Sequence, residues 1–525
     1  MSRLTDMIAQ FTAAPDAQRD ELAGALAHDS LTPVAASLRA ADGAVLALAD
    51  DDGAGGAELI VAAAPQGAEP AWFAEFSGER GEKDGATVLV AAPGADAMAL
   101  VRRIFPNLTP RPLGLDASFG FGDRLGLATP GHVAALRREG ADVAPIFAQQ
   151  SIREMERTCR TPDDVMADAT RGAFRAGWTG PVGADADHLK TFANVDDMAK
   201  AGFVFFTIDP SEHVDQKADD YSPGELDGKF AAMVEAGVPG ASEFLGLYKG
   251  KSFDLGVSSV VLDETSVKRA AVKYGRALAH IKNMADRTAK AMDGKPFELE
   301  ISVDETDQPT SVPEHLFIAL ELSRRGVAPV SLAPRFIGDF EKGVDYKGSV
   351  EAFRQSLVLH AAVAELYGPY KISLHSGSDK FGVYPLVGEL TKGAYHVKTA
   401  GTSYLEALRA VCRVDPELFR EIAAFSLRRF EADKVSYHIS AVLDKTPAPE
   451  GLSAAGMEKA YLDEDNGRQI LHVTFGSVLT TRGEHGGYLF RDDVYDLLRN
   501  NRETHEAVLA AHLAKHLRLL TGGRK

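Results

Sequence analysis

Strand-like runs that end in ionisable residues recur along the second half of this chain. Three of them are Ser302-Val-Asp-Glu-Thr-Asp307, Ser373-Leu-His-Ser-Gly-Ser-Asp-Lys380 and His396-Val-Lys-Thr-Ala-Gly-Thr-Ser403. Each run begins with alternating apolar and polar residues, and a Gly- or Pro-marked turn and a helical stretch follow it. In a parallel α/β barrel the catalytic side chains lie at the carboxyl ends of the strands, just before the βα loops. Several such runs in succession therefore predict one active site built from many strands.

Strand-like and helix-like segments alternate from about residue 113 onward. The candidate strands are Gly122–Ala128, Val143–Ala148, Val182–Asp187, Val204–Asp209, Leu299–Asp304, Val330–Arg335, Ile372–His375 and Tyr395–Lys398. Helix-period segments lie between most of them. About eight βα repeats favour a closed (β/α)8 barrel over an open sheet, because eight parallel strands close naturally.

The 525 residues are too many for one ordinary core, so we divide the chain into three parts. Residues 1–112 predict a small N-terminal α/β region, and residues 113–415 predict the barrel. The barrel carries a long insertion at 216–292, of the kind that forms a lid or an oligomer arm. Residues 416–525 predict a mostly helical C-terminal extension that contains one strand-like run, Ile470–Leu479.

The charge balance narrows the classes of partner. The formal net charge is −18, from 75 acidic and 57 basic residues, which argues against a nucleic-acid partner. The N-terminus lacks the apolar segment of a signal peptide, and no apolar run is long enough to span a membrane. We therefore expect a cytoplasmic enzyme that acts on a small molecule. The sequence leaves open whether the protein forms a homo-oligomer.

Strand alternation predicts which side chains point into the barrel. Glu298, Glu300, Ser302 and Asp304 share one face of their strand, and the other face is apolar. Applied to the other strands, the same rule gathers these residues at the upper rim: Asp209, Glu212, His213, Asp304, Glu305, Arg335, His375, His396 and Lys398. Charged groups packed this closely are costly to bury unless they are paired or bind a metal.

Histidines and carboxylates that come from different strands form a plausible site for a divalent cation. We expect His213, His375 and His396 as ligands, with Asp304 or Glu305 nearby; His132, His188 and His315 are weaker candidates. The metal can be Zn, Mn, Ni or Fe, and the sequence does not choose among them.

Several of the same residues are candidates for binding an anionic substrate. Arg335 can hold a carboxylate or phosphate with a bidentate fork. The loops around Asp379, Lys380 and Thr402 precede helices, where backbone N–H groups favour anions, and His375 is a further candidate for substrate contact. Lys398 can pair with Asp304, bind substrate charge, or act as a base or Schiff-base nucleophile.

Four long motifs resemble those of the tagaturonate epimerase family. They begin at Ser302, Ser331, His375 and Lys398, and the run His472-Val-Thr-Phe-Gly-Ser-Val-Leu479 also fits. The resemblance covers roughly residues 115–515. It implies a metal-dependent isomerase with a TIM-like barrel that interconverts the ketohexuronates tagaturonate and fructuronate at carbon 4, in hexuronate catabolism.

The resemblance also implies roles for individual residues. It places an acid/base residue at Glu212 and a metal ligand at His213. Asp304, Glu305 or Lys398 then supplies the second proton transfer. The reaction itself also needs an anchor for the substrate carboxylate, and we expect Arg335 and Lys380 to hold substrate anions. A retro-aldol route suits this reaction, because the hydrogen on carbon 4 is not adjacent to the ketone. Two alternatives remain: a metal-dependent aldolase or ketose isomerase acting on a phosphorylated sugar, and a catalytically silent sugar-binding barrel.

Overall fold

Eight parallel strands close into a barrel and follow one another around it in sequence order. The computed structural model describes residues 4–15, 18–52, 57–140 and 142–522. The barrel strands are β7 (Ser118–Phe121), β8 (Ala144–Ser151), β9 (Gly183–Leu189), β10 (Phe205–Ile208), β13 (Glu298–Val303), β14 (Ser331–Pro334), β15 (Lys371–Leu374) and β16 (Tyr395–Thr399). The predicted (β/α)8 barrel is confirmed, and seven of the eight predicted strands overlap an observed one.

The first predicted strand, Gly122–Ala128, is wrong. The strand there is β7, which ends at Phe121. The carboxylate of Asp123 accepts hydrogen bonds from the backbone N–H groups of Leu125, Gly126 and Ala128 at 2.7–3.0 Å. Because these N–H groups are bound to a side chain, they form a compact loop instead of a strand ladder.

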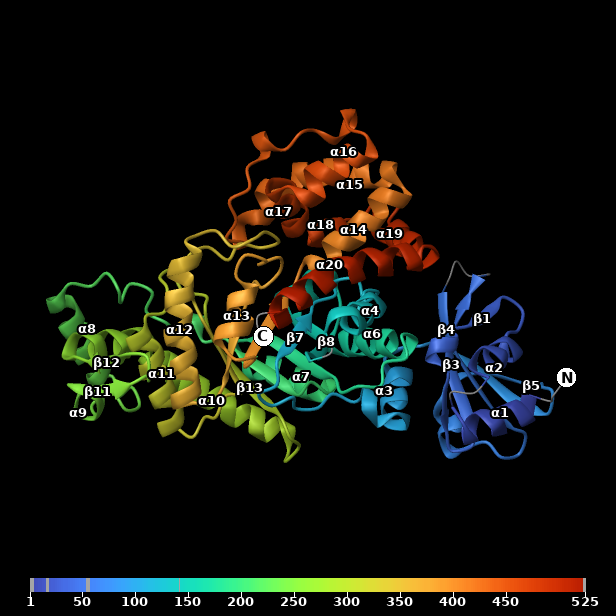
Figure 1. The fold of residues 1–525 in the computed structure, drawn as a ribbon, viewed down its shortest axis with the longest axis horizontal. Coiled ribbons are helices and arrows are strands. Elements are labelled where there is room, and N and C mark those ends of the chain that lie inside the picture. Colours follow the sequence, from blue (N-terminus) through green and yellow to red (C-terminus); the bar gives the residue numbers. More distant parts are fainter. Residues whose placement is uncertain (1–3, 16–17, 53–56, 141, 523–525) are drawn as a thin grey trace.

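Helices surround the barrel between successive strands (Figure 1). They are α4 (Thr129–Glu139), α5 (Ile152–Thr158), α6 (Pro162–Arg175), α7 (Phe192–Ala201), α10 (Glu264–Met292), α11 (Val312–Arg324), α12 (Val350–Tyr367) and α13 (Tyr384–Leu390). Thr161, Thr191 and Ser311 cap three of these helices through capping boxes, which satisfy the first free N–H groups.

The last barrel helix comes from the end of the chain. Helix α14 (Thr402–Val414) follows β16 but leads away from the barrel into a helical cap. Helix α20 (Arg502–Gly522) then returns and packs against both α4 and α13, so it occupies the position of the eighth barrel helix. Residues 402–501 are therefore topologically an excursion between the last strand and the helix that completes the ring.

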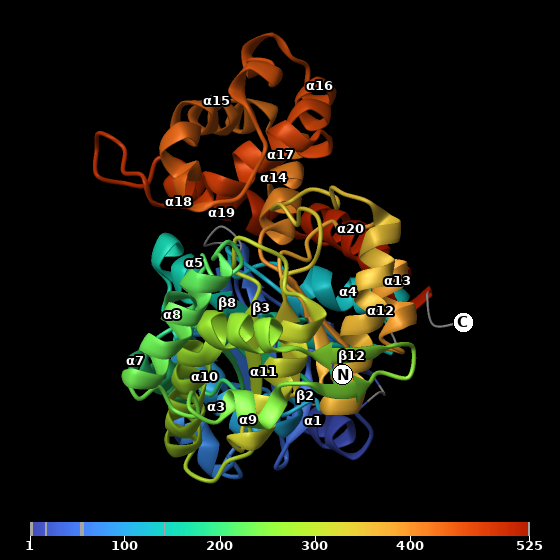
Figure 2. The same ribbon diagram turned by 90° about the vertical axis from the view of Figure 1, so that its left-hand side faces the viewer.

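The cap lies over one end of the barrel (Figure 2). It contains α14, α15 (Pro416–Asp433), α16 (Ala454–Glu458), α17 (Asp465–Val473), α18 (Phe475–Thr480) and α19 (Arg491–Asn500). The strand-like prediction for Ile470–Leu479 is wrong, because this segment forms α17 and α18. Its residues are buried almost throughout, and the periodicity of a short, mostly apolar run does not distinguish a buried helix from a strand.

The insertion after β10 packs beside the barrel. It consists of α8 (Pro223–Glu235), α9 (Phe244–Tyr248), the hairpin of β11 (Lys251–Asp254) and β12 (Ser259–Leu262), and the long helix α10. Helix α10 forms the C-terminal part of the insertion predicted at 216–292. That helix packs along α7, α8 and α11, so the insertion widens the helical layer of the barrel.

The N-terminal region is an antiparallel sheet with helices. The strands β1 (Leu31–Pro33), β3 (Ala44–Asp51), β4 (Ala57–Pro65), β6 (Ala86–Ala91) and β5 (Gly78–Lys83) pair in that order, and β2 (Arg39–Ala41) pairs with β3. Helices α1 (Leu4–Ala13) and α2 (Arg19–Leu26) accompany it, and α3 (Ala95–Ile104) leads toward the barrel. Arg175 on α6 joins the sheet to the barrel through Asp50 at 2.8 Å and Glu58 at 2.9 Å.

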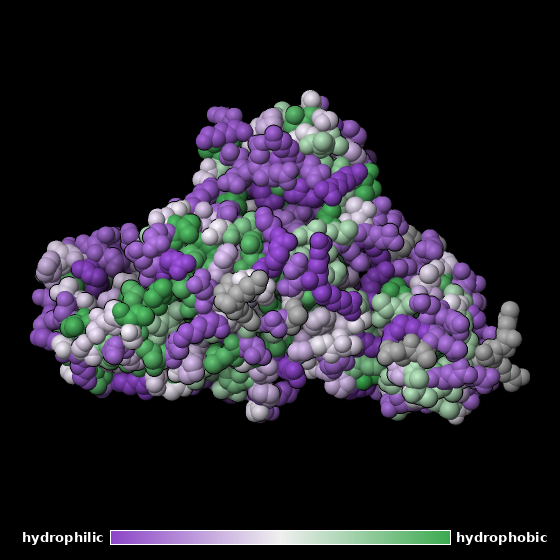
Figure 3. Space-filling model, in the orientation of Figure 1, coloured by the Kyte–Doolittle hydropathy of each residue, from purple (hydrophilic) through white to green (hydrophobic). Residues whose placement is uncertain are grey.

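Hydrophilic residues cover most of the cap on the face seen in Figure 3, and hydrophobic ones gather near α12. In the part of the chain that the structure describes, no helix combines the length and the apolar character that a membrane span requires.

Candidate active site

A cavity of about 520 Å³ opens where the barrel strands end and the cap begins. The barrel contributes Gln149, Asp187, His188, Asp304, Glu305, Arg335, His375 and Lys398, among others. The cap contributes Ser436, Tyr437, His438 and His472. Of the described residues that line this cavity, none comes from the insertion at 216–292. The carboxyl ends of the strands thus gather ionisable side chains at one place, as the sequence predicts.

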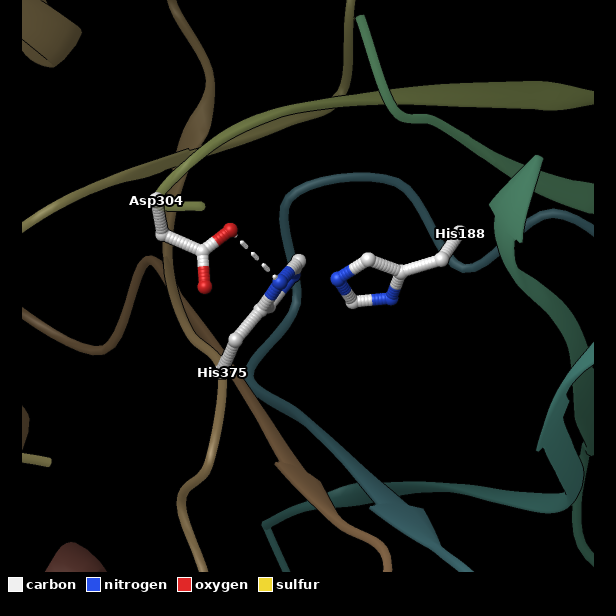
Figure 4. A group of neighbouring side chains, drawn as sticks. All are labelled: His188, Asp304 and His375. Atoms are coloured by element: carbon white, nitrogen blue, oxygen red, sulfur yellow. Dashed lines mark ion pairs between the residues drawn. The ribbon is translucent and has the colours of Figure 1, made fainter. Parts of the chain in front are cut away.

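Three side chains in this cavity are placed so that all of them can bind one metal ion. His188 is on β9, and Asp304 and His375 directly follow β13 and β15. One nitrogen or oxygen atom of each lies within 4.8 Å of the others, and the rings of the two histidines lie side by side, tilted, with 5.0 Å between their centroids (Figure 4). Nδ1 of His375 is buried, lies 3.1 Å from Oδ1 of Asp304 and has no well-oriented hydrogen-bond partner. An unpartnered buried nitrogen beside a carboxylate suits a cation held between them.

Each of the two histidines is held by a carboxylate at its other nitrogen. Nε2 of His375 lies 2.6 Å from Oε1 of Glu300, and Nδ1 of His188 lies 2.7 Å from Oδ1 of Asp187. Histidine ligands of metals usually carry such a carboxylate, which fixes the tautomer and the ring orientation. The arrangement therefore leaves Nδ1 of His375 and Nε2 of His188 as the candidate ligand atoms.

Lys398 fixes both of these carboxylates. Its ammonium group donates to Asp187 at 2.8 Å and to Thr207 at 2.6 Å. The same nitrogen lies 2.7 Å from Glu300 and 2.8 Å from Asp185. These contacts across the barrel confirm that Thr207, Glu300 and Lys398 point inward.

Burial alone would lower the pKa of Lys398, but the carboxylates of Asp185, Asp187 and Glu300 outweigh burial and raise it. Lys398 is therefore an ammonium ion that orders its neighbours. A base or a Schiff-base nucleophile would have to be neutral.

The floor of the cavity carries an excess of negative charge. Three carboxylates, those of Asp185, Asp187 and Glu300, surround the ammonium of Lys398, and a fourth, that of Asp304, pairs with His375. Burial opposes the charge on each histidine, yet Asp304 and Glu300 raise the pKa of His375 to about 10, and Asp187 raises that of His188. This environment favours additional positive charge, which protons or a divalent cation can supply.

The structure does not bring Glu212 and His213 into the cavity. Both lie in the single turn Ser211–His213 after β10. The Glu212 side chain is 71% exposed, with Lys190 at 3.7 Å as its nearest charge. The His213 ring stacks on His280, with 4.1 Å between the ring centroids. The turn directs both side chains toward the outer rim, so neither faces the other predicted residues.

His396 is inside the barrel but below the cavity. Its Nδ1 lies 2.9 Å from Oγ of Ser118 and its Nε2 lies 3.6 Å from Asp185. Within the described ranges, neither His213 nor His396 belongs to a group of closely placed candidate ligands, and of the predicted trio only His375 does. His188 takes their place. The signal for it in the sequence was Asp187-His188 at the end of a barrel strand.

Asp379, Lys380 and Thr402 are buried but do not line the cavity. Lys380 donates to the backbone carbonyl groups of Glu341 at 2.7 Å and Ser378 at 2.9 Å. Burial lowers the pKa of Lys380 to about 7. Lys380 therefore binds the backbone of neighbouring loops and does not face the cavity. Arg335, another predicted substrate-binding residue, does line the cavity.

A second group of candidate ligands, Asp379, His512 and His516, is already satisfied. Asp379 binds Arg468 at 2.8 Å and His512 at 2.5 Å. Nε2 of His516 accepts the N–H of Asp379 at 3.1 Å, and its Nδ1 donates to the carbonyl of His512 at 3.1 Å. With a guanidinium in place and both nitrogens of His516 occupied, this group holds α20 against the barrel.

Known proteins resemble this chain over nearly its whole length. A family model described as UxaE, tagaturonate epimerase, matches residues 35–520. A tagaturonate/fructuronate epimerase from Thermotoga maritima is 42% identical over 466 residues, which are 89% of this chain and 92% of that protein.

Solved structures agree with this match. The native crystal structure of fructuronate-tagaturonate epimerase UxaE from Cohnella laeviribosi is 34% identical, with a TM-score of 0.88, and covers 96% of this chain and 99% of its own. A glycerol complex of the same enzyme gives a TM-score of 0.87 at 34% identity, over 97% and 99% of the two chains. The resemblance drawn from the motifs is confirmed, as is the prediction of an isomerase: this chain belongs to the tagaturonate epimerase family.

Proposed function

We propose that this protein interconverts tagaturonate and fructuronate by inverting carbon 4, with the help of a divalent cation. Family membership supports the reaction. The observation that supports a bound cation is the group of His188, Asp304 and His375, whose candidate ligand atoms lie close together at the cavity. The proposal includes a cytoplasmic location for the protein.

The residues present fit a transition metal. Two imidazole nitrogens and one carboxylate oxygen suit Zn, Mn, Ni or Fe, and the donor set does not choose among them. Asp187 and Glu300 would orient the two histidines, and Lys398 would hold those carboxylates. When bound, the cation supplies Lewis acidity toward the oxygen atoms of the substrate.

The reaction itself limits what the side chains must do. With the ketone at carbon 2, the hydrogen on carbon 4 is not acidic, but the hydroxyl on carbon 4 is β to the ketone. A base removes that hydroxyl proton, and the electron pair left on the oxygen forms the C=O bond of an aldehyde at carbon 4. The C3–C4 bond breaks, and its electron pair passes to the fragment of carbons 1 to 3 as an enediolate. The aldehyde turns, the C3–C4 bond forms on its other face, and the proton returns to the oxygen on carbon 4.

We assign the base to Glu305. Glu212, the residue expected from the sequence, is mostly exposed outside the cavity. Glu305 lines the cavity next to Asp304, its side chain is 42% exposed, and its carboxylate lies 3.8 Å from Nε2 of His188. A partly exposed carboxylate at this point can reach a substrate hydroxyl while Asp304 serves as a ligand.

Replacing a candidate ligand tests the metal proposal. We expect His188→Gln to lose bound metal, measured by elemental analysis after dialysis, and to lose turnover of fructuronate together with it. His213→Gln is the matched control, because His213 lies outside the cavity, and it should keep both properties. Full metal content and turnover in His188→Gln would overturn the assignment.

A further inference from the structure

Three basic side chains that line the cavity form no ion pair with an acidic side chain among the described residues. They are Arg153 on α5, Arg335 after β14 and Lys342 in the following loop. Nε of Arg153 and Nε of Arg335 are buried and form no hydrogen bond. By contrast, Arg124 in the same cavity is paired with Glu154 at 2.9 Å, and Lys398 is surrounded by carboxylates. In a chain with a net charge of −18, unpaired cations in one cavity point to an anion that binds there.

Arg153 and Lys342 both line this cavity, and each also contacts a further residue of its wall. Lys342 donates to Oγ of Ser376 at 2.7 Å, and Arg153 lies over the ring of Tyr437 in the cap at 5.2 Å. Burial first, and the nearby charge of Arg153 second, lower the pKa of Lys342, while the carboxylates of Glu154, Glu305 and Asp304 act in the opposite direction. Two cations that repel each other in a partly buried place are stabilised by a shared anion.

We propose that Arg153 and Lys342 bind the C6 carboxylate of the ketohexuronate, with Tyr437 of the cap beside them. This inference rests on the proposed function and names the residues that make the site selective for uronates. Because Tyr437 comes from the cap, the cap contributes directly to substrate recognition.

Arg153 and Lys342, which together we call the carboxylate clamp, have a second role in the retro-aldol route. Cleavage between carbons 3 and 4 puts the carboxylate on the aldehyde fragment, which consists of carbons 4 to 6. This fragment must turn about its C4–C5 bond without leaving the cavity. A carboxylate held by two cations keeps one end of the fragment in place while the aldehyde presents its other face.

The specificity test compares uronates with ketoses that carry CH2OH at carbon 6. We expect Arg153→Gln and Lys342→Gln each to lower kcat/KM for fructuronate by roughly 10- to 100-fold, as a lost charge-assisted hydrogen bond implies. The kcat/KM for fructose should change much less, so the ratio of the two falls. Arg157→Gln is the matched control: Arg157 lies on the same helix and contacts Tyr437 and Ser436, but it does not line the cavity.

A second readout follows the fragments. If the clamp retains the aldehyde, Arg153→Gln should release dihydroxyacetone and a three-carbon aldehyde acid during turnover, visible by proton NMR, whereas the wild type releases little. If Arg153 had a purely structural role, its replacement would not cause these fragments to be released during turnover. Lys342→Gln provides the same test if Arg153→Gln does not fold.

Three results would overturn or separate the proposals. An unchanged fructuronate-to-fructose ratio and no fragments in both variants would refute the clamp. A loss of that ratio in Arg335→Gln alone would assign the carboxylate to Arg335 instead. A wild type that binds fructuronate by calorimetry but never converts it would refute the proposed function, and the clamp would then be tested by whether Arg153→Gln still binds.

Discussion

Lys398 is the residue on which most polar contacts of the site converge. It touches Asp185, Asp187, Glu300 and Thr207, and through Asp187 and Glu300 it fixes the orientation of two histidines. Strand alternation alone predicts that Lys398 points inward, but it does not predict which carboxylates it meets, because its partners come from β9, β10 and β13. The expected partner Asp304 pairs with His375 instead.

Removing this ammonium should be costly. We expect Lys398→Met to destabilise the fold by roughly 3–5 kcal/mol, because it leaves buried carboxylates uncompensated, and to lower metal affinity. Lys392→Met is the control: Lys392 forms an exposed pair with Glu365, and the change should cost less than about 1 kcal/mol. Urea unfolding followed by circular dichroism measures both, and equal midpoints in the two variants would contradict the role given to Lys398.

The two candidate bases can be separated directly. Glu305→Gln keeps the shape of the side chain but cannot accept a proton, so we expect turnover to fall by at least about 100-fold with metal content intact. Glu212→Gln should stay close to wild type, because Glu212 is exposed at the rim. If Glu212→Gln is inactive and Glu305→Gln is active, the base is the residue that the motifs indicated.

At the scale of elements, the strands and their inward faces could be predicted from the sequence, and the routing of the last helices could not. Periodicity reports burial along one segment, so it predicts β13 and β16 well. It does not report which segment fills the gap between α13 and α4. Helix α20 does so through its buried apolar residues and through His512, which meets Asp379, after a return of about a hundred residues.

The same limit explains why the sequence ranked His188 below His213 and His396 as a ligand. His188, Asp304 and His375 belong to strands that are far apart in the sequence, and only barrel closure brings them together. The loops after β15 and β16 looked like anion sites, but the cap and the neighbouring loops bind Asp379 and Lys380 from outside the cavity. Partners that come from another element cannot be predicted from local spacing.

The contact that docks α20 should respond to pH. Burial opposes the charge on His512, but Glu406 and Asp379 raise its pKa above the unfolded value of about 6.5. Its stabilising contribution is therefore complete below about pH 6.5 and is lost as the pH rises through the raised pKa.

We expect His512→Asn to cost about 1.5–3 kcal/mol at pH 6 and less at pH 9, measured by denaturant unfolding at both values. His438→Asn is the control, because His438 is largely exposed and far from this group in the sequence. A cost that grows with pH would contradict a charged His512.

At the scale of the whole molecule, the barrel and the cap form one site, and the returning helix α20 completes the helical ring of the barrel. The barrel supplies the candidate ligands, and the cap supplies Tyr437 and His472 to the cavity wall. A cation bound at His188, Asp304 and His375 would link three strands of the barrel, so it should stabilise the fold as a whole.

Metal removal should therefore lower the unfolding temperature. With metal at 100 times its dissociation constant, binding adds about 2.7 kcal/mol, and chelator should remove this gain. The His188→Gln variant should show no difference between metal and chelator. A wild-type unfolding temperature that is equal under both conditions would argue against a cation at this site.

One measurement tests the central claim most directly: a proton NMR time course of the purified protein with fructuronate and Mn²⁺ or Zn²⁺, repeated with chelator. We predict that tagaturonate appears with the metal and fails to appear with chelator. Tagaturonate formed equally fast in chelator would remove the cation from the reaction. An aldose uronate, or three-carbon fragments as the main product of the wild type, would contradict epimerisation at carbon 4.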